Sequence, residues 1–248
     1  MNARTYAATV RRVLAQLLGD RRTVALILVV PALLVILLSF VYRDYPHGEQ
    51  LFERIAVIMI AVLPMAVMFL VTSVTMLRER ASGTLERLWT TSLHRADLLT
   101  GYATAFTLVS VGQSLLLVAV CAWGLGVTIA GSWGWILLTA LLDAFVGVAL
   151  GLLVSAFSRT EFQAVQFMPV VVGPQIFLCG LLVARDQMPR ALELCSNVLP
   201  MSWAVDAVGE LTANATPTAD FALDMALLAA GGLVVLTVAA LTVPRRTR

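Results

Sequence analysis

Long apolar stretches alternate with short polar segments along the whole chain. Six stretches are nearly free of charge, and they span residues 23–42, 55–77, 98–123, 133–157, 164–184 and 221–243. Each is long enough for the roughly 20 helical residues that a hydrocarbon core of ~30 Å requires. None alternates with the period of a membrane β-strand, and in lipid a helix satisfies its own backbone. The pattern predicts an all-α integral membrane protein with six transmembrane helices in one domain over residues 1–248.

The composition supports a membrane location. Hydrophobic residues make up 60% of the 248 residues and charged residues 13%, against about 25% charged in soluble domains. The first stretch is not a cleaved signal peptide, because it is too long and Tyr42-Arg43-Asp44 follows it in place of small residues.

The distribution of arginine predicts the orientation. All 17 basic residues are arginine, and only Arg43, Arg54, Arg185 and Arg190 fall on one side of the predicted membrane. The positive-inside rule places the other, arginine-rich side in the cytoplasm. We therefore expect both termini and the polar segment after residue 77 to be cytoplasmic.

Residues that are missing or scattered exclude some chemistry. Because the chain contains no lysine, it lacks the residue that a P-loop places on the phosphates of ATP. The three cysteines and two histidines show no metal-ligand spacing. No catalytic Ser/His/Asp set or carboxylate pair falls within the apolar stretches. We expect no metal, cofactor or enzyme active site in this chain.

The N-terminal residues predict an amphipathic helix before the first span. Its apolar positions recur at helical spacing, and most of its polar positions lie on the other side. The apolar positions are Tyr6, Val10, Val13, Leu14, Leu17 and Leu18, and the polar ones are Arg4, Arg11, Arg12 and Gln16. Such a helix either lies in the interface with its arginines toward lipid phosphates or packs on the ends of the spans.

Polar residues and prolines inside the spans are candidates for a substrate pathway. Asp143 lies near the middle of a span, where a charge costs roughly 2.5–3.5 kcal/mol. It either contacts a substrate or proton, or hydrogen-bonds between helices. Pro169 and Pro174 should break the fifth span, and irregular backbone is tolerated against protein or a water-lined cavity. The candidate pathway residues are Asp143, Gln166, Pro169, Pro174 and Gln175.

Two shorter patterns predict how helices are arranged. Gly147 and Gly151 form a small-xxx-small pattern that permits close helix approach. Residues 192–208 are apolar, but they are too short and too often interrupted by polar residues to span the membrane. They predict a re-entrant or interfacial segment on the outer side.

A charged stretch lies between the second and third spans. Residues 78–88 read RERASGTLERL, and they combine charges of both signs with a small apolar face. Gly83-Thr84 provides a break and a helix start, because threonine caps helix N-termini. The stretch is either a short helix offered to a soluble partner or a solvated loop helix without one.

Three stretches resemble one known family. They are MLRERASGTLERL over residues 76–88, TEFQAVQFMP over residues 160–169 and LPMSWAVD over residues 199–206. The first is similar to the hallmark of type-2 ATP-binding cassette (ABC) transporter permeases, and most of all to the drug-resistance branch of daunorubicin exporters. The other two stretches resemble that branch at corresponding positions.

The resemblance implies a permease subunit of an ABC exporter in a bacterial cell membrane, paired with a second permease and with separate ATPase subunits. ATP and magnesium would bind to the ATPase. A coupling helix near residues 84–89 would rest on that ATPase, and Glu161 would lie at a second, minor contact. The coupling positions that the resemblance implies are Arg78, Glu79, Gly83, Thr84, Glu86, Arg87, Leu88 and Glu161.

Several functions remain open at this point. The expected function is export of a hydrophobic drug or lipid-like compound by alternating access. The same machine could export a lipid or polysaccharide. Alternatives from other classes are a proton-coupled secondary transporter that uses Asp143, and a membrane scaffold that recruits a soluble protein without moving a substrate.

Overall fold

The computed structural model describes residues 3–82 and 95–242, and within these ranges the chain is helical without a strand. Five helical segments are long and apolar enough to cross a membrane. They are α2 (Arg21–Tyr42), α3 (Gly48–Ala81), α5 (Arg95–Ala119) with the π-helical turn η1 (Val120–Gly124), α6 (Trp133–Phe157) and α11 (Ala219–Thr242). The predicted all-α membrane architecture is confirmed.

The predicted span over residues 164–184 is not a single helix. It consists of α7 (Glu161–Val171) and α8 (Gly173–Leu178), with 11 and 6 residues, so neither is long enough to cross a bilayer alone. Pro174 lies in the first turn of α8, where its missing N–H leaves no intrahelical bond unmade. The structure thus has five single-helix spans and one broken segment in place of six uninterrupted helices, and the break falls where the prolines indicated.

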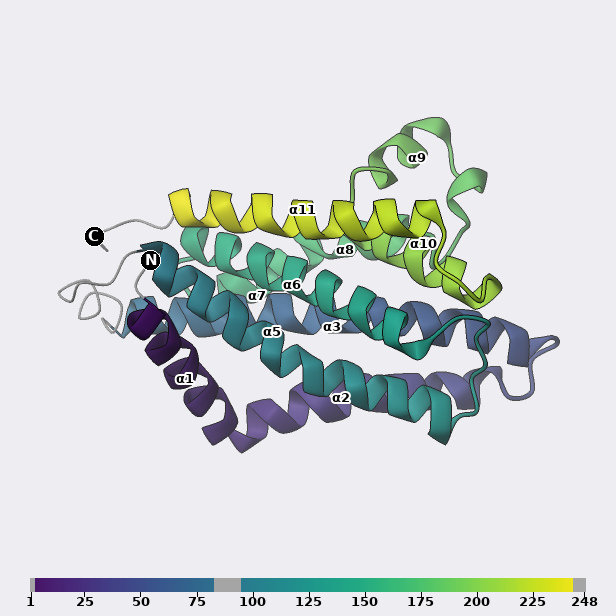
Figure 1. Cartoon of the computed structure of the whole chain (residues 1–248), viewed down its shortest axis with the longest axis horizontal. Coiled ribbons are helices and arrows are strands. Elements are labelled where there is room, and N and C mark those ends of the chain that lie inside the picture. Colours follow the sequence, from purple (N-terminus) through teal and green to yellow (C-terminus); the bar gives the residue numbers. More distant parts are fainter. Residues whose placement is uncertain (1–2, 83–94, 243–248) are drawn as a thin grey trace.

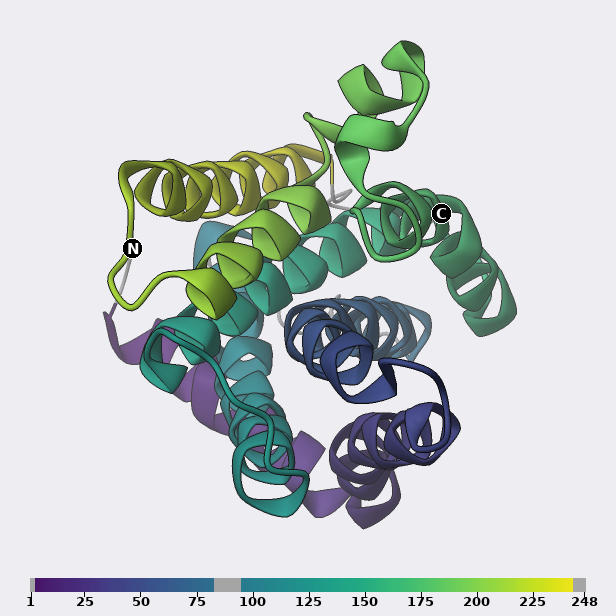
Figure 2. The same ribbon diagram turned by 90° about the vertical axis from the view of Figure 1, so that its right-hand side faces the viewer.

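Helix α3 occupies the middle of the bundle and contacts α2, α5, α6, α7 and α10 (Pro200–Ala213). Figure 2 views the helices from one end, with α3 (blue) lying between α2 (purple) and the layer that contains α6. A Cβ atom on Gly147 would lie 2.3 Å from the backbone oxygen of Met65, and one on Gly151 would lie 2.6 Å from that of Phe69. The predicted small-xxx-small contact is therefore the contact of α6 with α3.

The two ends of the bundle differ. The N-terminal and C-terminal helices, α1 (Ala3–Gly19) and α11, reach one end, which we call the arginine-rich end because Arg12, Arg78 and Arg80 lie there (Figure 1). The short helix α9 (Arg190–Ser196) projects at the opposite, α9 end. Helix α10 lies beside α11, and its C-terminal end points toward the α9 end. Its 14 residues are too few for a span, as the interrupted pattern of residues 192–208 predicted.

Helix α1 packs against the bundle. Val13 and Leu17 are buried and join a core cluster with residues of α5, whereas Leu18 is 61% exposed. Arg12, expected on the polar side of α1, points inward and pairs with Glu79 of α3. That expectation is wrong because the buried carboxylate of Glu79 binds the guanidinium. The spacing of polar residues along α1 does not show that such a partner is present. Of the two predicted placements, packing on the helix ends describes α1 better.

Lipid or protein must cover the outside of the bundle. Helices α2 and α11 are the least buried of the candidate spans, and large apolar side chains cover their outer faces. Examples are Leu26, Leu33, Leu37, Phe40, Leu233 and Val234. Apolar surface of this extent is typical of contact with lipid or another membrane chain.

We expect Gly147→Ala to lower the free energy of unfolding by about 1–3 kcal/mol, because the added methyl group forces α6 away from the backbone of α3. Gly209→Ala in α10 is the matched control, since a Cβ there meets no atom within 4 Å. Thermal unfolding in detergent measures both. Equal melting temperatures for the two variants would contradict the close contact.

Candidate functional site

The end of α3 is joined to the start of α7 by a bidentate ion pair. Arg78 donates from Nε to Glu161 Oε1 at 2.8 Å and from Nη2 to Oε2 at 2.9 Å. Thr160 caps α7 by accepting a hydrogen bond from the backbone N–H of Gln163. Glu161 therefore sits in the first turn, where a carboxylate is favoured. The structure brings together two residues for which the family resemblance implies a role in ATPase coupling.

The Arg78–Glu161 pair is open to solvent. Its side chains are 61% and 51% exposed, and exposed pairs contribute only about 0–1 kcal/mol. The hydrogen bond from Arg78 lowers the pKa of the Glu161 carboxyl below its usual value. The pair is therefore fully formed above the ordinary pKa of glutamate and is lost as the pH falls through the lowered value. A contact this weak can open and close at little cost.

The neighbouring residue, Glu79, is buried and faces the other way. Its carboxylate accepts hydrogen bonds from Arg12 Nη1 at 3.2 Å and Nη2 at 3.1 Å, and another from the Tyr102 hydroxyl of α5. Arg12 Nη2 also donates to the Tyr102 oxygen at 2.7 Å, and the guanidinium lies 5.7 Å from the centre of the tyrosine ring. We call these three residues the Arg12–Glu79–Tyr102 cluster.

Three consecutive residues at the end of α3 thus contact different helices. Arg78 binds α7, Glu79 binds α1 and α5, and Arg80 donates to the backbone oxygen of Ser155 near the end of α6. The partners Arg12, Tyr102 and Ser155 were not identified from the sequence. The one signal was a charged RER triplet that continues an otherwise apolar helix, which requires nearby partners.

The other predicted coupling residues, Gly83, Thr84, Glu86, Arg87 and Leu88, lie outside the described residues. What the structure does place are the two helices that carry this segment. Helix α3 ends at Ala81 and α5 begins at Arg95. Both helix ends contribute to the Arg12–Glu79–Tyr102 cluster, so the segment that contains residues 83–94 is attached to anchored supports.

The predicted pathway residues fall into two groups. Gln166, Pro169 and Pro174 are exposed on the outside of α7 and α8. Gln175 is buried, and its side chain donates to the Val171 oxygen at 3.1 Å and accepts from the backbone N–H of Met201 at 3.4 Å. Gln175 therefore joins the broken segment to the N-terminus of α10, and the structure does not bring all five residues to one surface.

Asp143 is fully buried in α6, and neither of its carboxylate oxygens has a hydrogen-bond partner among the described residues. The amide of Gln113 in α5 and the hydroxyl of Thr72 in α3 are also buried without a hydrogen-bond partner among the described residues. An ionised carboxylate without hydrogen bonds is costly in such a place.

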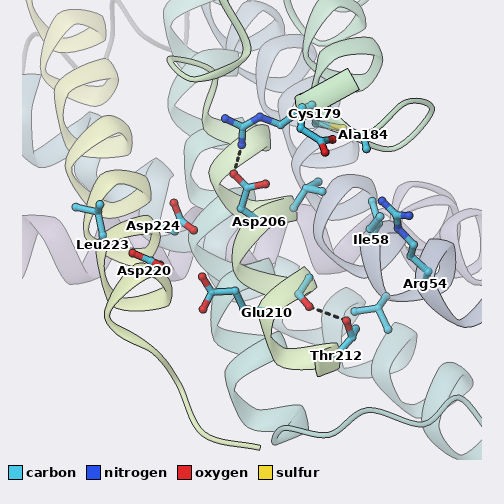
Figure 3. Close-up of a pocket in the computed structure, with 16 residues that line it drawn as sticks. Arg54, Ile58, Cys179, Ala184, Asp206, Glu210, Thr212, Asp220, Leu223 and Asp224 are labelled. Atoms are coloured by element: carbon cyan, nitrogen blue, oxygen red, sulfur yellow. Dashed lines mark hydrogen bonds and ion pairs between the residues drawn. The ribbon is translucent and has the colours of Figure 1, made fainter. Parts of the chain in front are cut away.

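A cavity of about 720 Å³ opens at the α9 end (Figure 3). Arg54 and Ile58 of α3, residues of α10 and the first turns of α11 line it. Glu210 of α10 and Asp220 and Asp224 of α11 face each other across it, as Figure 3 shows. The sequence did not predict that these acidic residues share one cavity.

Arginine fixes the loop beside this cavity. Arg185 pairs with Asp206 of α10 and donates from Nε to the Ser196 hydroxyl at 3.0 Å, and it also bonds the Asn197 side chain. The indole N–H of Trp203 donates to the Asn197 backbone oxygen at 2.9 Å. These bonds hold α9 and its flanking loop against α10.

Fold and site together define a multi-pass helical membrane protein with a charged cluster where α3 and α5 meet α1. Residues 4–211 match the family described as ABC-2 type transporter, and the chain belongs to this family. The resemblance inferred from the three sequence stretches is thereby confirmed.

Curated relatives include transport proteins from bacteria and a eukaryote. The chain is 27% identical over 153 residues to the probable multidrug ABC transporter permease YbhR of Escherichia coli, which covers 62% of this chain and 42% of that protein. It is 28% identical over 146 residues to the linearmycin resistance permease protein LnrN of Bacillus subtilis, covering 59% and 38%. It is 28% identical over 153 residues to the ABC transporter G family member 20 of Dictyostelium discoideum, covering 62% and 21%. The matches thus span less than half the length of these relatives.

Glu79 and Asp143 are both buried acids, and replacing each with its amide should affect stability differently. Glu79→Gln removes a carboxylate that accepts hydrogen bonds from Arg12 and Tyr102, so we expect the free energy of unfolding to fall by about 1–3 kcal/mol. Asp143→Asn removes a carboxylate with no partner among the described residues, so stability should be unchanged or increase. Thermal unfolding in detergent compares them. A large loss for Asp143→Asn would show that its carboxylate has a structural partner.

Proposed function

We propose that this chain is the permease subunit of an ATP-driven exporter that moves a hydrophobic drug or lipid-like compound out of the cell by alternating access. Family membership supports this function, and so do the names of the bacterial relatives, which refer to multidrug transport and linearmycin resistance. The observation that carries the proposal is that Arg78, Glu79 and Arg80 contact four other helices directly before the segment that contains residues 83–94. A displacement of that segment is passed to most of the bundle.

The energy source in this proposal is a separate ABC ATPase that binds ATP and magnesium. These 248 residues contain no lysine, so the proposal assigns the P-loop to a partner ATPase. The segment that contains Gly83, Thr84, Glu86, Arg87 and Leu88 would dock on this ATPase from the cytoplasm, with both termini on the same side. Arg78 and Glu161 would form the rim of the docking surface, since both are exposed there.

A second permease, either another copy or a sister chain, completes the proposed transporter. Its place is suggested by the exposed apolar side of α7 and α8, where Phe162 is 72% exposed and Phe177 is 64% exposed. Gln166, Pro169 and Pro174 lie exposed on the same two helices. A substrate pathway between two permeases would place these three residues along its wall, with membrane lipid on the remaining surface.

The docking proposal is tested by purification of the tagged chain in mild detergent from its host, followed by mass spectrometry. We expect a soluble P-loop protein with the wild-type chain and its loss when Glu86→Ala and Arg87→Ala are combined. Arg190→Ala with Glu193→Ala is the matched control, because it removes an exposed acid–arginine pair, 3.0 Å apart, at the α9 end. Recovery of the intact wild-type chain without any P-loop protein would contradict the proposal.

One observation favours a second function, a proton-coupled carrier. Asp143 is a buried carboxylate without a hydrogen-bond partner among the described residues, and such groups occur in proton relays. This function requires export to survive ATP depletion and to stop when the proton gradient is collapsed or Asp143 becomes Asn. Export that follows ATP and tolerates Asp143→Asn would eliminate it.

A further inference from the structure

The cluster formed by α1 links both supports of the segment that contains residues 83–94. Glu79 lies just before this segment in the sequence, and Tyr102 lies just after it. Arg12 of α1 binds both of them, through two bonds to the carboxylate and one to the tyrosine oxygen. The Arg12 side chain therefore joins the end of α3 to the first turns of α5. Along the chain, these two helices are connected through the segment that contains residues 83–94.

We propose that Arg12 is a positioning residue of the coupling machinery, which with Glu79 and Tyr102 clamps α1, α3 and α5 into one rigid unit that moves when the ATPase displaces the segment between α3 and α5. This inference rests on the proposed function, because it assumes an ATPase that docks there. It changes the role of Glu79: its carboxylate acts inside the chain and does not touch the partner.

A second set of contacts holds α1 on α5 independently of the charges. The Tyr6 hydroxyl lies 2.7 Å from the Thr104 hydroxyl. Thr9 is buried against Gly101, where an added Cβ would come within 2.8 Å of the threonine methyl group. Tyr6, Thr9 and Val13 are spaced three and four residues apart, so they form one continuous face of α1. A helix lying freely in the membrane interface would not need this fit.

The two ion pairs at the end of α3 are suited to different tasks. The Glu79 side chain is 4% exposed and that of Arg12 is 33% exposed, and removing one partner of a buried pair leaves a charge uncompensated. The Arg78–Glu161 pair is more than half exposed and is correspondingly weak. The buried pair therefore persists through the transport cycle, whereas the exposed pair can open between α3 and α7.

Rigidity is tested by a disulfide between α1 and α5. Thr9→Cys and Gly101→Cys would place their Cβ atoms about 3.0 Å apart, roughly 0.5 Å below the usual separation in disulfides, so α1 must shift slightly for the bond to form. The pair is introduced with Cys195→Ser, which removes the exposed native cysteine. We expect the oxidised transporter, reconstituted with its ATPase, to keep ATP-driven export within about two-fold of the reduced form. A loss of ten-fold or more that reductant reverses would show that α1 must separate from α5, and the proposal would be wrong.

The clamp itself is tested by Arg12→Ala, with Arg11→Ala on the exposed side of the same helix as the control. We expect Arg12→Ala to retain the ATPase and its hydrolysis but to export about ten-fold less substrate per ATP hydrolysed. Exchange of the charges, Arg12→Glu with Glu79→Arg, should restore part of this coupling. Unchanged export per ATP in Arg12→Ala would overturn the clamp, as would a charge exchange no better than its single variants.

These outcomes separate the clamp from the proposed function. If no P-loop protein accompanies the wild-type chain, the proposed function is wrong, and the clamp proposal, which depends on it, is wrong as well. If the ATPase binds and drives export but Arg12→Ala behaves like Arg11→Ala, only the clamp fails. Should Arg12→Ala not accumulate in the membrane, the disulfide still decides, because it leaves the three clamp residues in place.

Discussion

Helix α3 lies so close to α6 that only glycine fits at two of the contact positions. The backbone oxygens of Met65 and Phe69 occupy the space that side chains at Gly147 and Gly151 would need. Within a bilayer, such close packing replaces the hydrophobic drive that holds soluble helices together. The contact sets α3 at the centre of the bundle, and α2, α5, α7 and α10 then pack against it.

Because α3 lies at the centre of the bundle, a displacement of its end can be transmitted to the helices that pack around it. Arg78, Glu79 and Arg80 continue α3 beyond its apolar part and bind α7, α1 with α5, and α6. Burial distinguishes these contacts, since Glu79 is shielded and Arg78 is open to solvent. A permanent connection on one side of α3 and a weak one on the other suit a bundle that must change shape while part of it stays rigid.

The sequence predicted what depends on local pattern. Apolar length identified the spans, Pro169 and Pro174 identified the broken segment, and two glycines identified the close contact. The sequence did not predict contacts between residues that lie far apart along the chain. Arg12 was placed on the polar side of the first helix, because helical periodicity does not reveal a partner 67 residues away in the sequence. The cavity at the α9 end was missed for the same reason, since α3, α10 and α11 each supply only part of its lining.

The most direct test of the account is site-specific photo-cross-linking at position 88 in intact membranes, with position 193 at the α9 end as the reference. The account predicts a cross-link from position 88 to a soluble nucleotide-binding protein, and none to it from position 193. A cross-link to that protein from position 193, or none from position 88 while the transporter is active, would contradict a coupling site at the arginine-rich end.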